Sequence, residues 1–208
     1  MDKKFIPLSH LDADPFWGNG VYAIYYSGPH PIYQAVRTGM REHPVYVGLS
    51  TSDRRKSKMT YGRPIEDYLD ELATDEKPKP TLTLFDRLRD HQFSISQVAE
   101  RDERMGMQFF GIKYLVTESI FSFRAESILK DHYRPVWNDC VDGFGNKDPG
   151  GTRRGDESGP IRGTKPVWDT LHPGRFWADY MHDGPLSRPQ LEEKVIAYLA
   201  TLAEEGQK

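Results

Sequence analysis

The chain of 208 residues has one cysteine, Cys140, so it can form no internal disulfide. Such usage is typical of a reducing compartment, and we expect a cytoplasmic protein. No run of about 18 apolar residues occurs, which argues against a membrane span. The first residues also lack the apolar run of a signal peptide. Walker motifs, dinucleotide glycine motifs and Cys/His metal clusters are missing, which excludes the commonest nucleotide and zinc sites.

An excess of positive charge is also missing, because the formal net charge is −3. A site for a polyanion must therefore come from local clusters of Lys and Arg. In the Gly-rich segment 142–166 the charges nearly cancel, so binding there would rest on individual side chains, namely Arg153, Arg154, Arg162 and Lys165. The densest cluster lies in 53–63. Clusters of this kind are also typical of solvated loops, so both interpretations stay open. The candidate contacts are Arg54, Arg55, Lys56, Lys58, Arg153, Arg154 and Arg162.

What the sequence does contain is a set of short strands rich in Tyr and β-branched residues. Gly20–Tyr26 and Pro44–Gly48 are such runs, bounded by Gly, Pro or Ser, and we expect them to pair antiparallel. Alternating apolar residues in Gln108–Glu118 predict a third strand. With 12% aromatic residues and this length, the chain is expected to fold as one domain with a sizeable core.

Helical spacing follows these strands. Thr81–His91 carries Leu84, Phe85 and Leu88 on one stripe, with Arg87 and His91 sharing a flanking face. Ile120–Tyr133 is predicted to bury Ala125, Ile128, Leu129 and His132, with Glu126 at the edge of that face, and to end before Pro135. Short helices are expected at 32–37, 64–73 and after His172. Pro189–Glu205 has an apolar stripe for core or dimer contact: Leu191, Val195, Ile196, Leu199 and Leu202.

The order of these motifs resembles the GIY-YIG nuclease superfamily. Gly20-Val21-Tyr22 is similar to the GIY motif and Tyr46-Val47-Gly48 to the YIG motif, each with Val for Ile. The helix Arg and His, the helix Glu and the terminal Asn of the family match Arg87, His91, Glu126 and Asn138. The resemblance implies an α+β fold, with a small central antiparallel β-sheet flanked by helices. We expect one endonuclease domain over 1–208, with its core at 20–138 and a C-terminal loop and helices at 139–208.

Three further segments are similar to small type II restriction endonucleases that cut CCGCGG: 135–138, 141–146 and 172–175. This resemblance implies site-specific hydrolysis of double-stranded DNA at a palindromic, GC-rich site. It also implies one Mg²⁺ per active site, a homodimer on the palindrome and a companion DNA methyltransferase. Two departures stand out: the first hairpin carries an insertion, and Leu49 replaces a Lys that relatives of this branch can carry.

The resemblance also assigns roles to the matching side chains. Glu126 binds the metal, Arg87 holds the phosphate, and Asn138 orients Glu126 or a metal-bound water. Tyr22 is the candidate base. A phenol with a pKa near 10 is ionised to only about one part in a thousand at neutral pH, so something must lower that pKa or take the proton. We expect Tyr22 and His91 to act as one relay, with Tyr46 placing the water or the scissile phosphate.

Two alternatives keep the same core. A homing or repair nuclease would cut or nick as a monomer, and its size on DNA would separate it from a dimeric restriction enzyme. A sequence-specific DNA-binding protein without catalysis is the other, although the complete set of catalytic-type side chains argues against it.

Overall fold

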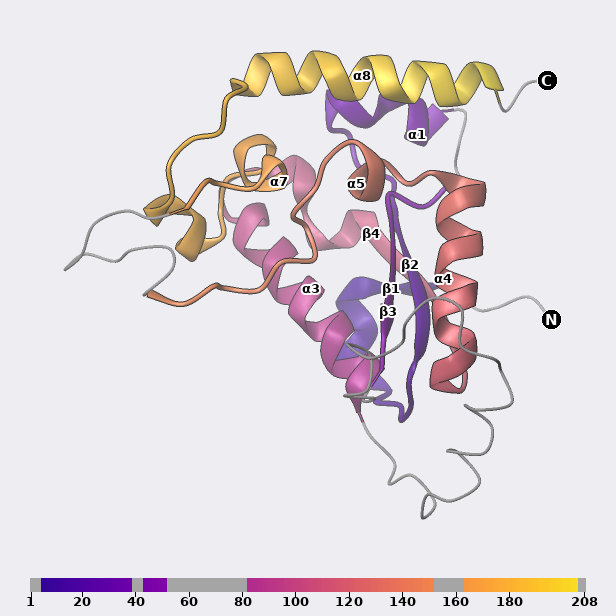
Figure 1. Cartoon of the computed structure of the whole chain (residues 1–208). Coiled ribbons are helices and arrows are strands. Elements are labelled where there is room, and N and C mark those ends of the chain that lie inside the picture. Colours follow the sequence, from indigo (N-terminus) through magenta and orange to yellow (C-terminus); the bar gives the residue numbers. More distant parts are fainter. Residues whose placement is uncertain (1–4, 39–42, 52–81, 152–162, 206–208) are drawn as a thin grey trace.

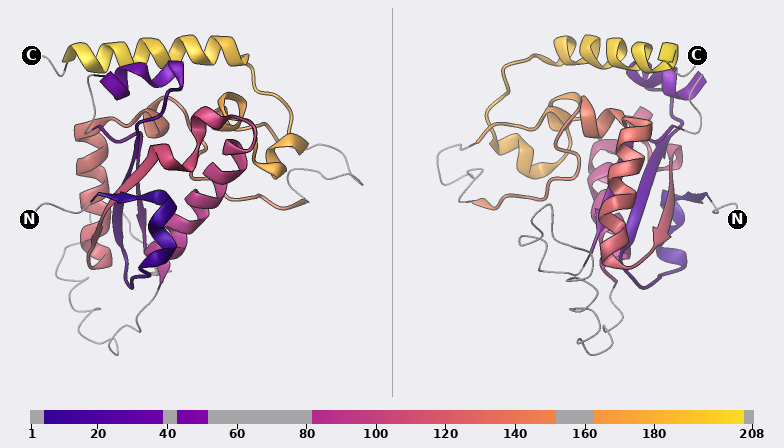
Figure 2. Two further views of the ribbon diagram at one scale, coloured as in Figure 1. Left: turned by 180° about the vertical axis from the view of Figure 1, so that it is seen from behind. Right: turned by 45° about the vertical axis from the view of Figure 1, so that its right-hand side comes forward.

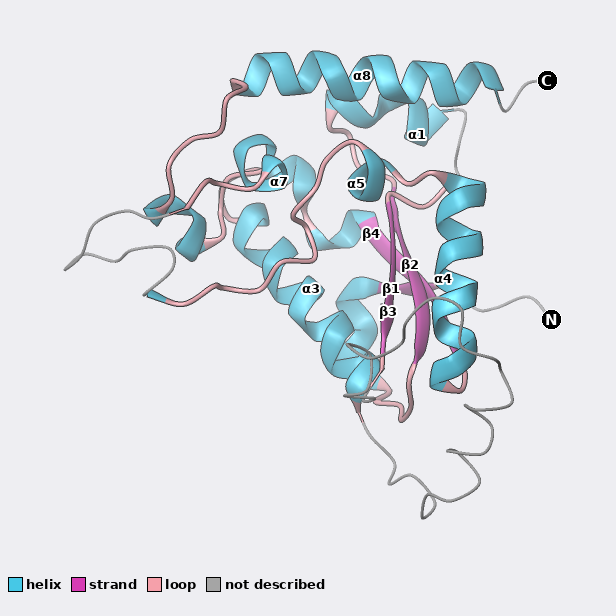
Figure 3. Cartoon of the chain, viewed as in Figure 1, coloured by secondary structure: helices cyan, strands magenta, loops and turns pink. Residues whose placement is uncertain are grey.

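The computed structural model describes residues 5–38, 43–51, 82–151 and 163–205. Its centre is a four-stranded antiparallel sheet in the order β1-β4-β2-β3 (Figures 1 and 3). The strands are β1 (Ile6–Pro7), β2 (Gly20–Tyr26), β3 (Tyr46–Ser50) and β4 (Phe110–Val116). The predicted α+β fold with its small antiparallel sheet is therefore confirmed.

The two Tyr-containing strands form the predicted antiparallel pair. β2 has the predicted bounds, whereas β3 begins two residues later than predicted, after Pro44 and Val45. Tyr22 lies opposite Gly48 on β3 and opposite Tyr114 on β4. This register brings a Tyr and the Gly of the second motif next to each other on neighbouring strands.

Alternation along β2 divides its side chains between two buried faces, since successive residues of a strand point to opposite sides. Tyr22 and Ile24 belong to the main core, which includes residues of helix α3 (Thr83–Ala99). Ala23 and Tyr25 pack with Val47 and with Leu129 of helix α4 (Ser119–Tyr133) on the other face. The sheet is thus covered on both faces, and α3 and α4 both contact β3.

The long helices agree with the sequence in part. α3 buries Leu84, Phe85 and Leu88 as predicted, but continues eight residues beyond His91. α4 ends as predicted, with Arg134 in the left-handed conformation before Pro135. The predicted buried stripe of α4 is wrong for two residues, because Ile128 is 50% exposed and His132 is also exposed.

The insertion in the first hairpin forms the short helices η2 (Pro31–Tyr33) and α1 (Gln34–Thr38). The C-terminal helix α8 (Arg188–Glu205) lies across both of them at one end of the molecule (Figures 1 and 2). Its predicted stripe is buried except for Ile196, which is half exposed. The stripe therefore packs mainly in the core of the protomer. Among the described helices, none has the length and apolar character needed to cross a membrane.

Three regions predicted as irregular or only loosely assigned have short elements. The segment before β2 forms β1 and η1 (Leu8–Ala13), and η4 (Glu103–Met105) and η5 (Met107–Phe109) join α3 to β4. The C-terminal part contains α7 (Val167–Leu171) and η6 (Phe176–Tyr180), the latter where a helix after His172 was predicted. The predicted helix at 64–73 lies outside the described residues.

The outer edge of β3 is closed by the short helix α5 (Val136–Asp139). The backbone N–H of Trp137 donates to the carbonyl of Val45 at 2.8 Å. The side-chain amide of Asn138 then accepts from the Val47 N–H at 2.8 Å and donates to the Val47 carbonyl at 2.9 Å. Asn138 thereby imitates the backbone of a further strand and holds β3 in place.

Candidate active site

The centre of the candidate site is a buried pair of side chains, Tyr22 from β2 and His91 from α3. The Tyr22 hydroxyl lies 2.6 Å from His91 Nε2, and both side chains are 1% exposed. The helix presents His91 to the strand because α3 packs its apolar stripe on this face of the sheet. The two side chains that we expect to act as one relay thus lie within hydrogen-bonding distance of each other, and the relay itself stays a prediction.

The electrostatic surroundings keep both members of this pair neutral. Burial raises the pKa of Tyr22 well above its ordinary value; Tyr46 adds to the rise, and the charge and hydrogen bond of Arg87 oppose it. Burial and the positive charge of Arg87 hold the pKa of His91 well below its ordinary range. A neutral His91 can therefore accept the Tyr22 proton at Nε2. The pKa of Tyr22 is raised and not lowered, so a lowered pKa, one of the two ways in which this phenol was expected to act as a base, does not fit this structure.

Arg87 and Tyr46 complete one side of the site. Arg87 lies one helical turn before His91 on α3 and donates through Nη2 to the carbonyl of Gly145 at 2.6 Å. Its positive charge also opposes the rise in the pKa of Tyr22. The ring of Tyr46 lies 5.3 Å from that of His91, centroid to centroid. Gly48 makes room for this cluster, since a Cβ at Gly48 would lie 2.5 Å from the Tyr22 hydroxyl oxygen.

A segment after the sheet also contributes to the site, and this role was not predicted. The Phe144 ring stacks on the His91 imidazole at 4.6 Å with an interplanar angle of 14°. A Cβ at Gly145 would lie 2.6 Å from the Tyr46 hydroxyl oxygen, so the backbone passes close to the site. A pocket of about 150 Å³ opens beside Arg87 and His91, with this segment as one wall. The signal available in the sequence was the Gly-Phe-Gly run at 143–145, which is typical of close backbone approach.

Glu126 comes from α4, on the other side of β3. Its side chain is 20% exposed, and Oε1 lies 2.8 Å from Nζ of Lys130. The negative charge of Glu126 contributes to the raised pKa of Tyr22, so the two groups act on each other electrostatically. The two helices that flank β3 therefore supply Arg87 and Glu126 to one region of the sheet.

The side chains present are compatible with Mg²⁺ and unsuited to a closed structural metal site. Within the described ranges, no group of three or more His, Cys, Asp or Glu could hold a metal ion. Mg²⁺ keeps several waters and often takes only one or two carboxylates together with phosphate oxygens. One partly exposed carboxylate, Glu126, matches that requirement.

The remaining predicted residues are placed differently or not described. Asn138 uses one donor and one acceptor of its amide on Val47, next to Tyr46 in the chain, so its contact in this structure is with β3. The residues predicted to contact DNA lie outside the described residues: Arg54, Arg55, Lys56, Lys58, Arg153, Arg154 and Arg162.

Comparison with known proteins agrees with this geometry. The family model described as the Eco29kI GIY-YIG domain matches residues 14–199. No curated protein matches the chain. The match extends from before β2 into α8, so it covers strands β2, β3 and β4, both flanking helices and the Gly-Phe-Gly segment, but not β1. The chain therefore belongs to the Eco29kI family of GIY-YIG restriction endonucleases, which are nucleases that act on DNA.

Proposed function

We propose that the protein is a type II restriction endonuclease that hydrolyses phosphodiester bonds of double-stranded DNA at a specific site in a Mg²⁺-dependent reaction. The observation that carries this proposal is the buried hydrogen bond between Tyr22 and His91 beside Arg87, inside the region that matches the family. A phenol, an imidazole and a guanidinium so arranged suit proton transfer next to a bound phosphate.

The chain's own residues would act as follows. Arg87 binds the scissile phosphate through charge-assisted hydrogen bonds and stabilises the charge that develops on its oxygens. Tyr22 takes a proton from the attacking water as its own hydroxyl proton passes to His91 Nε2. The oxygen of that water forms the new bond to phosphorus, and the bond from phosphorus to the 3′ oxygen breaks. Tyr46 places the water or the phosphate.

This relay avoids a free phenolate. Ionising an isolated phenol at neutral pH costs about 4 kcal/mol, and the raised pKa of Tyr22 makes that route worse here. Passing the proton directly to His91 requires only that the imidazole become basic enough. Burial is the main cause of the lowered pKa of His91, and the positive charges of Arg87, Arg175 and Lys147 lower it further. A bound DNA phosphate offsets such charges, so substrate binding would raise the basicity of His91.

Glu126 would hold the Mg²⁺ with water and phosphate oxygens as its other ligands. When bound, the ion would neutralise phosphate charge and help the departure of the 3′ oxygen. Lys130, at 2.8 Å from Glu126, orients the carboxylate until the metal binds. Asn138 would act through β3, because it holds Val47 beside Tyr46.

The recognition site is proposed to be palindromic and GC-rich, similar to CCGCGG. A palindrome cut on both strands implies a homodimer whose two-fold axis coincides with that of the DNA. Arg side chains that bond guanine O6 and N7 are the natural readers of G·C pairs. A cytoplasmic enzyme of this type would need a companion methyltransferase to protect the host DNA.

The test is a plasmid digestion with Mg²⁺ and with excess EDTA. We expect discrete fragments only with Mg²⁺, and sequencing of their ends would identify the site. The Glu126→Gln variant should be inactive, whereas Asp131→Asn, an exposed acid on the same helix, is the matched control and should cut normally. Fragments of random length would refute site specificity, and full activity in EDTA would refute the metal requirement.

A further inference from the structure

The backbone segment that touches the site, residues 143–146, has no regular helix or strand to hold it. It nevertheless makes two close contacts with catalytic side chains. The Gly145 carbonyl accepts from Arg87 at 2.6 Å, and the Phe144 ring stacks on His91. The placement of this segment therefore affects both the proposed phosphate ligand and the proposed proton acceptor.

A single buried side chain, Arg175, binds this segment at three points. Its Nη1 donates to the carbonyls of Phe144 at 3.1 Å and Asn146 at 3.0 Å, and its Nη2 donates to that of Gly143 at 2.9 Å. Nε donates to Asp169 at 2.6 Å, and Nη2 also donates to the second carboxylate oxygen of Asp169. A guanidinium has five N–H donors, so all the donors of Arg175 are used.

Arg175 and Asp169 are fully enclosed. Arg175 is 0% exposed and Asp169 1%, and the guanidinium lies 4.8 Å from the ring centre of Trp168 and 4.5 Å from that of Trp177. A buried ion pair often adds no net stability over apolar residues of similar size, because both charges lose their hydration. Stability alone is therefore a weak explanation for the buried ion pair. The three hydrogen bonds of Arg175 to one segment call for a different explanation.

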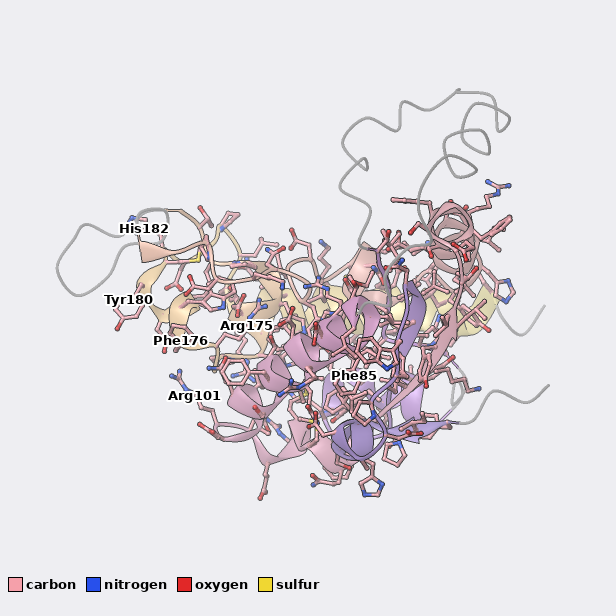
Figure 4. The ribbon with its side chains drawn as sticks, turned by 90° about the horizontal axis from the view of Figure 1, so that it is seen from below. Phe85, Arg101, Arg175, Phe176, Tyr180 and His182 are labelled. Atoms are coloured by element: carbon pink, nitrogen blue, oxygen red, sulfur yellow. The ribbon has the colours of Figure 1, made fainter. Side chains whose placement is uncertain are left out.

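A nearby pair provides a contrast. Arg101 and Asp179 form a comparable ion pair, with Nη2 to Oδ2 at 2.7 Å, but both side chains are nearly half exposed. Figure 4 shows Arg101 projecting outward from the end of α3, whereas Arg175 lies inside the C-terminal part. Within the described part of the chain, Arg101 bonds to Asp179 and not to the 143–146 segment, so it offers the same chemistry without the connection to the site.

We propose that Arg175 is a positioning residue for the active site, which holds residues 143–146 in the conformation that orients Arg87 and His91. This proposal rests on the nuclease function proposed above. Arg175 touches no reacting atom. It acts through the Gly145 carbonyl on Arg87 and through the Phe144 ring on His91, while Asp169 balances its charge.

The experiment compares Arg175→Lys with the matched control Arg101→Lys. A lysine keeps the charge but cannot reproduce five planar donors, so the three carbonyls lose their common partner. We expect kcat for DNA cleavage by the folded Arg175→Lys variant to fall about 10²-fold, as small displacements in active sites do. The Kd for DNA should change far less than kcat, because Arg175 itself does not contact the DNA in this proposal, and Arg101→Lys should match the wild type in both.

A second readout does not depend on cleavage. The stacked Phe144 ring should shift the ¹³C-labelled His91 ring signals upfield, and these signals are assigned by their loss in His91→Gln. In Arg175→Lys the upfield shift should disappear, and in Arg101→Lys it should remain. A merely structural role for Arg175 would lower the melting temperature and leave both kcat of the folded fraction and the His91 signals unchanged.

The outcomes are distinct. A folded Arg175→Lys variant with wild-type kcat and His91 signals overturns the proposal. If this variant does not fold, Arg175→Met/Asp169→Asn, which leaves no unpaired buried charge, takes its place in the same comparison. If the wild type and Arg101→Lys cut no DNA under any condition, the proposed function fails. The His91 signals then still decide whether Arg175 positions the segment.

Discussion

Substituting Gly48 by Ala should disable the site without unfolding the protein. Gly48 lies opposite Tyr22, and an added Cβ would lie 2.5 Å from the Tyr22 hydroxyl oxygen and 2.9 Å from Cε1 of Tyr46. Ordinary van der Waals contact begins at 3.4 Å. The Tyr22 hydroxyl oxygen must therefore move away from the new Cβ by roughly 0.9 Å, which is 3.4 Å minus 2.5 Å. Tyr22 cannot move freely, because it is 1% exposed and lies 2.6 Å from His91.

The displacement would stretch the contact between Tyr22 and His91 beyond hydrogen-bonding distance. Misplacement of about 1 Å at a reacting group typically costs about 10²-fold in rate. We therefore expect kcat of Gly48→Ala to fall by about that factor. Alanine loses less backbone freedom than glycine on folding, which favours the variant by about 0.5–1 kcal/mol and offsets part of the steric cost.

The assay is single-turnover cleavage of plasmid DNA, together with thermal unfolding and a DNA-binding titration. Gly184→Ala is the matched control, because the nearest atom to its Cβ would be Cγ2 of Thr164 at 3.8 Å, an ordinary contact. It should cut at the wild-type rate. A folded Gly48→Ala protein that also cuts at the wild-type rate would refute the assignment of Tyr22 as a catalytic residue.

Three further predictions concern proton transfer, metal binding and acid stability. Tyr22→Phe and His91→Ala should be strongly non-additive in a double-mutant cycle on the cleavage rate, and additive effects would remove the relay. Lys130→Gln should lower the Mg²⁺ concentration that gives half-maximal cleavage, because the ammonium 2.8 Å from Glu126 competes with the metal; an unchanged requirement would exclude that competition. Burial and the charge of Arg104 lower the pKa of His30 to about 4, so the fold keeps this histidine neutral while the unfolded chain binds a proton below pH 6.5. Well above pH 6.5 His30 is neutral in both states and the protein has its full stability. As the pH falls from 7.5 to 5, protonation of His30 in the unfolded chain should lower the free energy of unfolding by about 2 kcal/mol. Urea titrations of His30→Phe at the two pH values should not show this loss of unfolding free energy. His10→Phe, at an exposed position, should show the same loss as the wild type.

The elements predicted well are those in which a local pattern agrees with the tertiary packing. β2 alternates between two buried faces, and its Gly and Ser boundaries are local signals. α3 buries the stripe that its spacing predicts, and that packing presents Arg87 and His91 to Tyr22. The family resemblance then supplied the roles of these side chains, which spacing alone could not assign.

The failures come from contacts that no local pattern encodes. α4 packs on a small patch of Ala23, Tyr25 and Val47. Among the side chains that the structure describes, Leu129 is the partly buried apolar partner of this patch, and Ile128 is left half exposed. The Arg87 bond to Gly145 spans 58 residues and the Asn138 bonds to Val47 span 91. Side chains that act on distant backbone, such as Arg175, have no sequence period that would reveal them.

The closure of β3 by Trp137 and Asn138 limits how two copies of the chain could meet on a palindrome. An open edge strand is a template on which another chain can add its own strand. Here the N–H and carbonyl of Val47 are already occupied, as is the carbonyl of Val45. Across this edge, two copies of the chain therefore cannot join into one continuous sheet, and a homodimer of the kind proposed above would have to use other surfaces.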